Sequence, residues 1–160
     1  MLEFCQWLEQ SPVGASVRQS MWLFPILECL HLLGMTALLG VIGTFDLRLL
    51  GWVLRRLPLA QMAKKLLPWA WAGFSAQVVT GALLFASEAV KLSTNPAFRI
   101  KLLLIGLAGT NALIFHAMNR RTLPAWDERS ALPIRAKLAG LASLLLWAGV
   151  VVAGRMIGFV

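Results

Sequence analysis

A glutamate and a histidine stand three residues apart in the stretch FPILECLHLLGM, residues 24–35, which is otherwise almost entirely apolar. An imidazole nitrogen can bind a metal or a haem iron, and a carboxylate one helical turn away can hold the other ring nitrogen. His31 is therefore the candidate haem or metal ligand, with Glu28 as its orienting partner and Met35 as a soft sulfur ligand. The structural alternative is a hydrogen bond between Glu28 and His31 within one helix, with Met35 as core filler.

The composition places this pair in a membrane. Of the 160 residues, 59% are hydrophobic and 14% are charged, which is typical of membrane proteins rather than soluble domains. A helix needs about 20 apolar residues to cross a bilayer, so the length allows four crossings in a single domain. We expect an all-α, antiparallel bundle of four transmembrane helices. The predicted spans cover about residues 21–45, 66–87, 100–117 and 138–159.

The opening residues MLEFCQWLEQSP precede the first span and predict a short amphipathic helix that lies in the membrane interface. Pro12 is expected to end this helix. The side chains expected to face lipid are Leu2, Phe4, Trp7 and Leu8.

Lysine and arginine gather in the two connections that follow the first and third spans, which predicts that both connections are cytoplasmic. Both termini would then lie on the non-cytoplasmic side. We attribute most of the net charge of +8 to this topology and to anionic lipids rather than to nucleic acid. The ten residues are Arg48, Arg55, Arg56, Lys64, Lys65, Arg120, Arg121, Arg129, Arg135 and Lys137.

Polar residues fall on single faces of the predicted helices, and these faces should meet inside the bundle, because ionisable groups rarely face lipid. In the second helix, the face holds Gln77, Thr80, Gly81 and Glu88. In the outer half, Glu28 or Glu88 is expected to pair with Lys101 or Arg155. The complete interior polar network would consist of Glu28, Glu88, Lys101, Arg155, Asp46 and Asn111.

His116, in the third span, is the second candidate cofactor ligand. At about 1.5 Å of rise per residue, His31 lies about 3 Å outward of the midplane and His116 about 10 Å inward. Such a separation disfavours a haem held by both histidines. A helix-end or headgroup contact is the alternative role for His116.

The same residues carry a resemblance. The string WLFPILECLHLLGMTALLGVIGTFDLRLLG, followed by TGALLFA and NPAFRIKLLLIGLAGTNALIFH, resembles a family of short, uncharacterised bacterial four-helix membrane proteins. The shared pattern is Pro, Glu-x-x-His, Gly, then Asp-x-Arg-x-x-Gly, and the resemblance implies the same fold in the bacterial inner (cytoplasmic) membrane. More loosely, LHLLGMTALLG is similar to a helix of the copper-resistance membrane domain and of the bacterial membrane protoporphyrinogen oxidase, which implies a haem role for His31.

Two classes of function stay open. In the first, the bundle binds b-type haem or a metal through His31 and serves membrane electron transfer, with quinone as a candidate partner. In the second, it is a non-catalytic accessory or assembly subunit, without a cofactor, that contacts lipids and other membrane subunits or further copies of itself. The sequence shows no hydrolase nucleophile set, phosphate-binding loop or nucleic-acid module, and whether the protein is an enzyme stays open.

Overall fold

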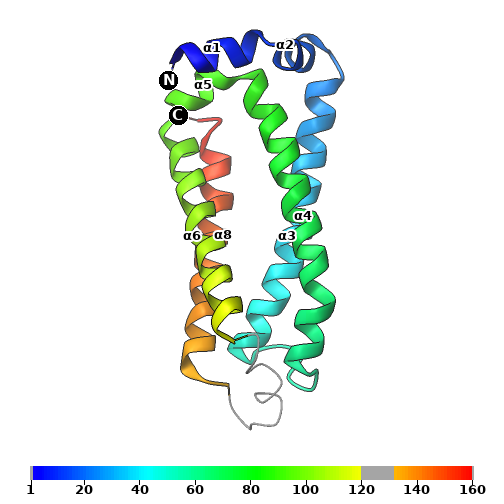
Figure 1. The fold of residues 1–160 in the computed structure, drawn as a ribbon, viewed down its shortest axis with the longest axis vertical. Coiled ribbons are helices and arrows are strands. Elements are labelled where there is room, and N and C mark those ends of the chain that lie inside the picture. Colours follow the sequence, from blue (N-terminus) through cyan, green and yellow to red (C-terminus); the bar gives the residue numbers. More distant parts are fainter. Residues whose placement is uncertain (1, 120–131, 160) are drawn as a thin grey trace.

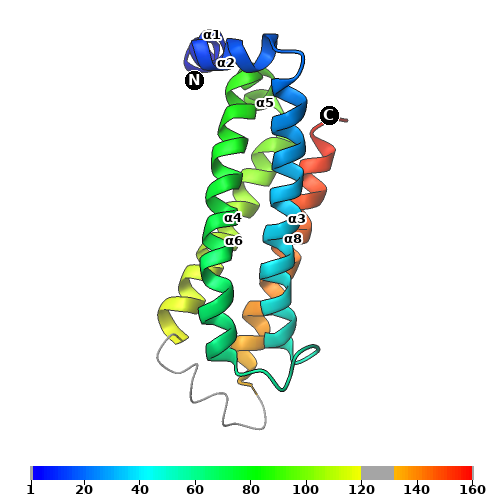
Figure 2. The same cartoon turned by 90° about the vertical axis from the view of Figure 1, so that its right-hand side faces the viewer.

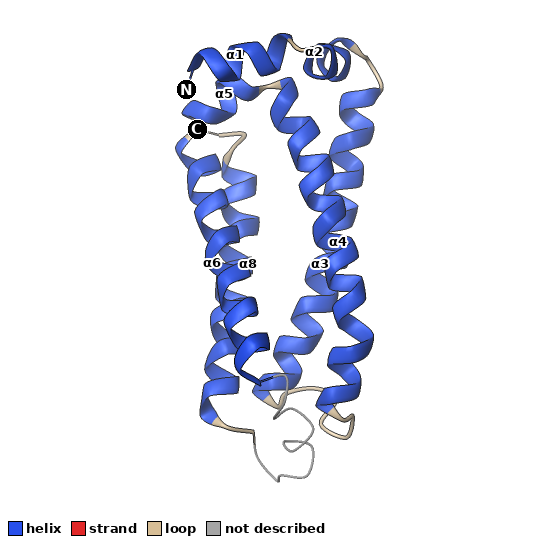
Figure 3. Cartoon of the chain, viewed as in Figure 1, coloured by secondary structure: helices blue, strands red, loops and turns tan. Residues whose placement is uncertain are grey.

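The computed structural model describes residues 2–119 and 132–159. Within these residues the regular structure is entirely helical (Figure 3). The helices are α1 (Leu2–Gln10), α2 (Pro12–Gln19), α3 (Leu23–Leu50), α4 (Leu59–Ser87), α5 (Ala89–Thr94), α6 (Pro96–Asn119) and α8 (Ile134–Met156). Four of them, α3, α4, α6 and α8, are long and apolar enough to cross a membrane. The prediction of an all-α bundle with four membrane-spanning helices is confirmed.

Local signals fix the ends of the long helices. The Ser20 hydroxyl oxygen accepts a hydrogen bond from the Leu23 N–H (3.1 Å) at the start of α3, and Gly51, with a φ of +76°, closes its end. At the start of α6, the Asn95 side-chain oxygen accepts from the Phe98 N–H (3.1 Å), and Pro96 is the first residue. Proline suits this position because the first helical turn needs no N–H donor.

The observed helices differ from the predicted spans at their ends. The first span, about 21–45, is Leu23–Leu50, and the second, about 66–87, is Leu59–Ser87. The third, about 100–117, is Pro96–Asn119, and the fourth, about 138–159, is Ile134–Met156. All four helices continue past at least one predicted end into sequence that holds polar residues, so hydropathy alone placed that end too far inward. The start of the first span and the end of the fourth were instead predicted two and three residues too far outward.

The long helices form two antiparallel pairs. In one pair α3 packs against α4, and in the other α6 packs against α8 (Figure 1). The pairs are joined through α3 and α8. Figures 1 and 2 together show that the two ends of the chain lie at one end of the bundle, with the loop between α3 and α4 at the other. This loop holds part of the basic sequence predicted to be cytoplasmic, whereas Arg120, Arg121 and Arg129 lie outside the described residues.

The pairs meet near the loop between α3 and α4, in a contact that we call the α3–α8 junction. Its core contains Leu49, Leu59 and Ala136, all at most 2% exposed. Gly140 of α8 lets the helices approach closely, because a Cβ atom there would lie 3.1 Å from both the Asp46 carbonyl oxygen and the Leu49 Cβ atom. The close approach of α3 and α8 at this junction therefore depends on glycine at position 140.

At the opposite end, α1, α2 and α5 form a layer across the bundle (Figure 1). Leu2, Phe4 and Trp7 are exposed, as expected for the interfacial segment, whereas Leu8 is half-buried. The prediction that Pro12 ends a single helix was incomplete. Ser11 separates the two helices and caps the second. Its hydroxyl oxygen accepts a hydrogen bond from the Gly14 N–H (3.2 Å), and Pro12 is the first residue of this second helix, α2.

Glu9 fixes this layer to the bundle. One of its carboxylate oxygens pairs with the Arg18 guanidinium of α2 (2.6 Å), and the other accepts from the Val90 N–H of α5 (3.0 Å). Gly14 lies directly on the end of α4, because a Cβ atom there would be 2.6 Å from the Ala86 carbonyl oxygen. One carboxylate and one glycine thus connect α1 and α2 to α4 and α5.

Candidate functional site

His31, in the outer half of α3, is held from the neighbouring helix α4. Its Nδ1 lies 2.8 Å from the Thr80 hydroxyl oxygen. The same hydroxyl lies 2.8 Å from the Ala76 carbonyl oxygen, which can only accept. With the imidazole proton on Nδ1, Nδ1 donates to Thr80 and Thr80 donates to Ala76, so both contacts are hydrogen bonds and Nε2 keeps its lone pair. Nε2 has no hydrogen-bond partner among the described residues.

Gln77 and two glycines bring α4 close to this histidine. The Gln77 side-chain NH₂ donates to the His31 carbonyl oxygen (2.8 Å). A Cβ atom on Gly34 would lie 2.5 Å from the Gln77 Nε2, and one on Gly81 would lie 3.2 Å from the His31 Cε1. The sequence placed Gln77, Thr80 and Gly81 on one inward face, and the structure shows that this face holds the histidine.

Lys101 of α6 approaches the same region from the other helix pair. It lies close enough to His31 for its charge to act on the imidazole. Its side chain runs over Gly154 of α8, where a Cβ atom would be 3.6 Å from the Lys101 Nζ. Within the described part of the chain, this ammonium has no hydrogen bond and no ion pair. His31 and Lys101 are therefore two polar groups from different helix pairs, each with hydrogen-bonding capacity that no described residue uses.

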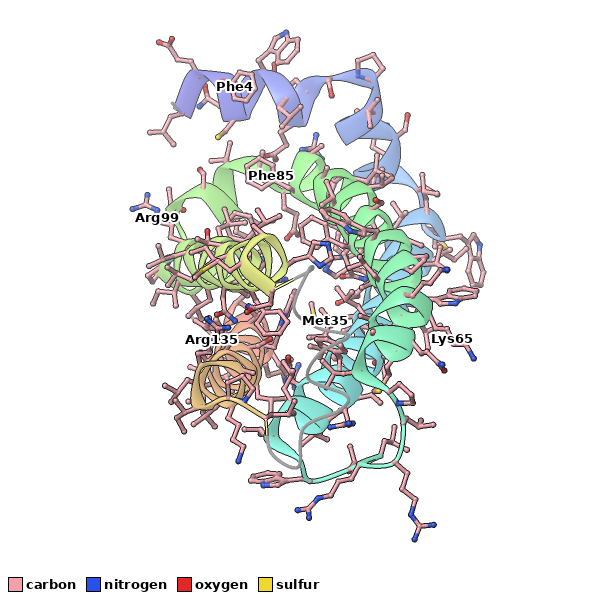
Figure 4. The ribbon with its side chains drawn as sticks, turned by 60° about the horizontal axis from the view of Figure 1, so that its bottom comes forward. Phe4, Met35, Lys65, Phe85, Arg99 and Arg135 are labelled. Carbon is pink, nitrogen blue, oxygen red and sulfur yellow. The ribbon has the colours of Figure 1, made fainter. Side chains whose placement is uncertain are left out.

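Glu28 and Met35 flank His31 along α3. Glu28 is exposed and makes no hydrogen bond or ion pair with a described residue. The hydrogen bond from His31 goes to Thr80 instead, so the expected Glu28–His31 bond does not form. Met35 is half-buried, and Figure 4 shows it on the side of α3 that faces the interior of the bundle.

The expected interior polar network does not form as one network in the described residues. Glu88 pairs with Lys91 (3.5 Å), three residues along the chain, rather than with Lys101. Arg155 is exposed and lies over the Phe159 ring, 5.1 Å from its centroid. Both groups lie near a helix end, where a local partner can be reached without crossing the bundle.

Asp46 and Asn111 lie further inward, where each contacts α8. The Ser143 hydroxyl donates a hydrogen bond to the Asp46 carboxyl group. The Asn111 side-chain NH₂ donates to the Ala139 carbonyl oxygen (3.1 Å), which connects α6 to α8. No role was predicted for Ser143 from the sequence. Ser143 lies one helical turn from Gly140, and this position indicates a role only when α3 and α8 are known to be in contact.

His116 does not reach His31. It is exposed and lies near the end of α6. His31 is eight residues into α3 and His116 twenty residues into α6. Both helices start at the same end of the bundle (Figure 1), so His116 lies roughly 18 Å further along at 1.5 Å per residue. The structure thus keeps the two candidate ligands apart.

Residues 2–119 and 132–159 contain no group of three or more His, Cys, Asp or Glu side chains arranged to hold a metal ion. Cys5 is buried, Cys29 is exposed, and both are free thiols.

Fold and site together define a multi-pass helical membrane protein with a single histidine held between two of its spans. The chain belongs to the family DUF6644, described as a family of unknown function, whose model matches residues 4–160. The comparisons found no match among curated proteins or solved structures.

Proposed function

We propose that this protein binds b-type haem through His31 and serves electron transfer in the bacterial inner membrane. The observation that carries the proposal is the setting of the His31 ring, with Nδ1 2.8 Å from the Thr80 hydroxyl oxygen, where it can donate, and Nε2 left without a partner among the described residues. A metal-bound imidazole needs this arrangement, because the second ring nitrogen normally donates to an acceptor that fixes the tautomer and the ring plane.

Lys101 supports the choice of haem over a bare metal ion. Haem b carries two propionate groups, and a carboxylate placed in the membrane needs a cation nearby. The Lys101 ammonium is unpaired within the described residues and close to His31. A metal ion, in contrast, would find one histidine and, among the described residues, no cluster of three or more His, Cys, Asp or Glu side chains. Haem bound here supplies one-electron transfer, and its partner would be a quinone or another membrane subunit.

The separation of His116 from His31 bears on which residues would hold a haem. His116 does not reach His31, so each chain would contribute His31 alone of its two histidines, and any further protein ligand would come from another group or subunit. Met35 lies one turn from His31 on the same helix, and its side chain would pack against a bound haem.

Absorbance of the protein purified in a gentle detergent tests the proposal. Wild-type protein should show a Soret band with about one haem per chain. His31→Ala should abolish it, whereas His116→Ala, the matched control on another helix, should keep most of it. Thr80→Val keeps the shape but removes the acceptor for Nδ1–H, and it should lower haem retention. Purified protein without haem or stoichiometric metal would contradict the proposal.

A non-catalytic accessory subunit is the second candidate, and a specific observation favours it. Gly106 and Gly109 of α6 have no atom within 4 Å of a built Cβ position. Small residues that leave a helix surface open let a further transmembrane helix approach closely. Crosslinking from Gly106→Cys in native membranes would reveal a neighbour on this face, and colourless protein with such a neighbour would support this role.

The proposed topology places both termini on the non-cytoplasmic side. Trp52, exposed in the loop between α3 and α4, should then be cytoplasmic. In a chain with Cys5 and Cys29 replaced by alanine, Trp52→Cys should resist a membrane-impermeant maleimide in intact cells and react after lysis. Labelling in intact cells would reverse the orientation.

A further inference from the structure

A cavity lies between α3 and α8, away from the His31 site. It has a volume of about 190 Å³. Apart from one carboxyl group, its walls are apolar or aromatic. The residues that line it are Leu39, Ile42, Gly43, Asp46, Leu144, Trp147, Ala148 and Val151.

The carboxyl group of Asp46 is only half satisfied. Asp46 is 5% exposed, and one hydrogen bond reaches its carboxyl group from the Ser143 hydroxyl. Its Oδ2 atom is buried and has no hydrogen-bond partner in the part of the chain that the structure describes. A buried acceptor without a partner is costly wherever bulk water cannot reach it. A ligand in this cavity is therefore expected to place a hydrogen-bond donor against Oδ2.

The nearest cationic side chain along α3 does not supply that donor. Arg48 uses its guanidinium for the loop between α3 and α4, where Nε and Nη2 donate to the Leu57 carbonyl oxygen (3.2 and 3.0 Å). Its Nη2 also donates to the Arg55 carbonyl oxygen (3.3 Å). Arg48 is thus committed to closing the loop, and Asp46 keeps its free oxygen.

The size and walls of the cavity narrow the class of ligand. An apolar cavity of about 150 Å³ is large enough for a benzene molecule, so this one fits a single substituted six-membered ring. The Trp147 indole offers a face or an edge for such a ring. Gly43 leaves room, because nothing lies within 4 Å of its built Cβ position. A water molecule would need two to four polar partners, and these walls offer one carboxyl group.

We infer that this cavity binds a lipid-soluble ring alcohol, a phenol or a quinol, whose hydroxyl group donates to Asp46 while its ring contacts Trp147. A neutral hydroxyl suits the apolar walls better than a cation, which would lose its hydration. The site is independent of haem binding. Asp46 lies fifteen residues beyond His31 on the same helix, roughly 22 Å away at 1.5 Å per residue.

Fluorine NMR of the full chain in lipid nanodiscs tests the inference, with 4-fluorophenol as the probe and 4-fluoroanisole as its methyl ether without a donor. The phenol should bind several-fold to about tenfold more tightly than the ether, as expected for one hydrogen bond to a buried carboxyl oxygen. A benzoquinol with a ten-carbon tail should displace the phenol if the site accepts membrane quinols. Failure of the quinol to compete, with the phenol bound, would restrict the site to tail-free phenols and overturn the quinol part.

Two variants locate the binding. Gly43→Leu fills the cavity and should abolish phenol binding, whereas Gly106→Leu, on a surface of α6 that is equally open, should leave it unchanged. Asp46→Leu should bind phenol and ether alike. Helical circular dichroism and a single gel-filtration peak check that each variant is folded. Equal binding of the two probes to wild type, unchanged binding in Gly43→Leu, or no binding at millimolar phenol would each overturn the inference.

Discussion

Helix α3 meets α4 around His31 and meets α8 around Asp46, and the two contacts are built differently. At His31, side chains of α4 contact both one ring nitrogen and the backbone of α3, through Thr80 and Gln77. At Asp46, α8 presents a glycine to the α3 backbone, and one carboxylate oxygen is left without a partner. The first contact is specified by hydrogen bonds, whereas the second is specified by shape.

This difference predicts which changes matter at each place. A contact made by shape fails when volume is added and tolerates a change of polarity. A contact made by hydrogen bonds fails when a donor or acceptor is removed, even if the volume is kept. Variants of matched size and chemistry can therefore separate the two kinds of contact.

The largest effect is expected at the α3–α8 junction. Gly140→Leu places a side chain where a Cβ atom alone is 3.1 Å from the Asp46 carbonyl oxygen. We expect a loss of about 3 kcal/mol in the free energy of unfolding, measured by steric trapping in bicelles. Gly106→Leu adds the same side chain in open space and should cost less than about 0.5 kcal/mol. Equal losses would mean that the junction is not fixed by shape.

Thr80→Val should come next. It keeps the volume but leaves the His31 Nδ1–H without its acceptor, which should cost about 1–2 kcal/mol. Thr110→Val is the matched control, since the Thr110 hydroxyl also donates to a carbonyl oxygen one turn back, that of Gly106 (2.8 Å), but serves no other helix. Thermal unfolding in detergent should rank Thr80→Val well below Thr110→Val, and a reversed order would contradict the role of Thr80.

A smaller effect is expected for Asp46→Leu in the absence of ligand. The variant loses one hydrogen bond from Ser143 and also removes the unpartnered Oδ2 atom, so the two changes offset each other. The freed Ser143 hydroxyl can bond to the carbonyl oxygen one turn back in α8. Stability should stay within about 1 kcal/mol of wild type in the same unfolding measurement. A loss above about 3 kcal/mol would show that both oxygens are satisfied in the membrane.

The smallest effect is expected for Glu28→Gln. Glu28 is exposed and has no ion pair or hydrogen bond with a described residue, so neutralising it should change stability by less than about 0.5 kcal/mol. Lys91→Gln, which breaks a surface pair with Glu88, gives a comparison of similar size. A large loss from Glu28→Gln would restore the interior role that the sequence suggested for it.

The four spans could be predicted because long apolar runs and basic flanks are local properties of the chain. The inward face of α4 could also be predicted, since Gln77, Thr80 and Gly81 share a helical periodicity. The residues of α3 that these side chains contact could not be predicted. A periodicity shows which side of a helix is polar but not which neighbour it meets, so Glu28 was expected inside the bundle although it is exposed.

The predicted depth of a residue along its helix was more reliable than the predicted polar face. The rise along a helix placed His31 and His116 at different levels, and the structure keeps them apart along the bundle (Figure 1). The Asp46 site needed contacts that the sequence does not contain. Gly140 and Ser143 are ordinary small residues of an apolar helix until α3 is seen against them.

The hydrogen bonds around His31 all close within the pair formed by α3 and α4. This has a consequence for synthesis of the chain, because these two helices leave the ribosome before α6 and α8. They can enter the bilayer as one hairpin with His31 and Gln77 already partnered, before α6 exists. Lys101 then arrives opposite a histidine whose orientation is set, and α8 completes the assembly at a glycine contact that needs no polar group to find its partner.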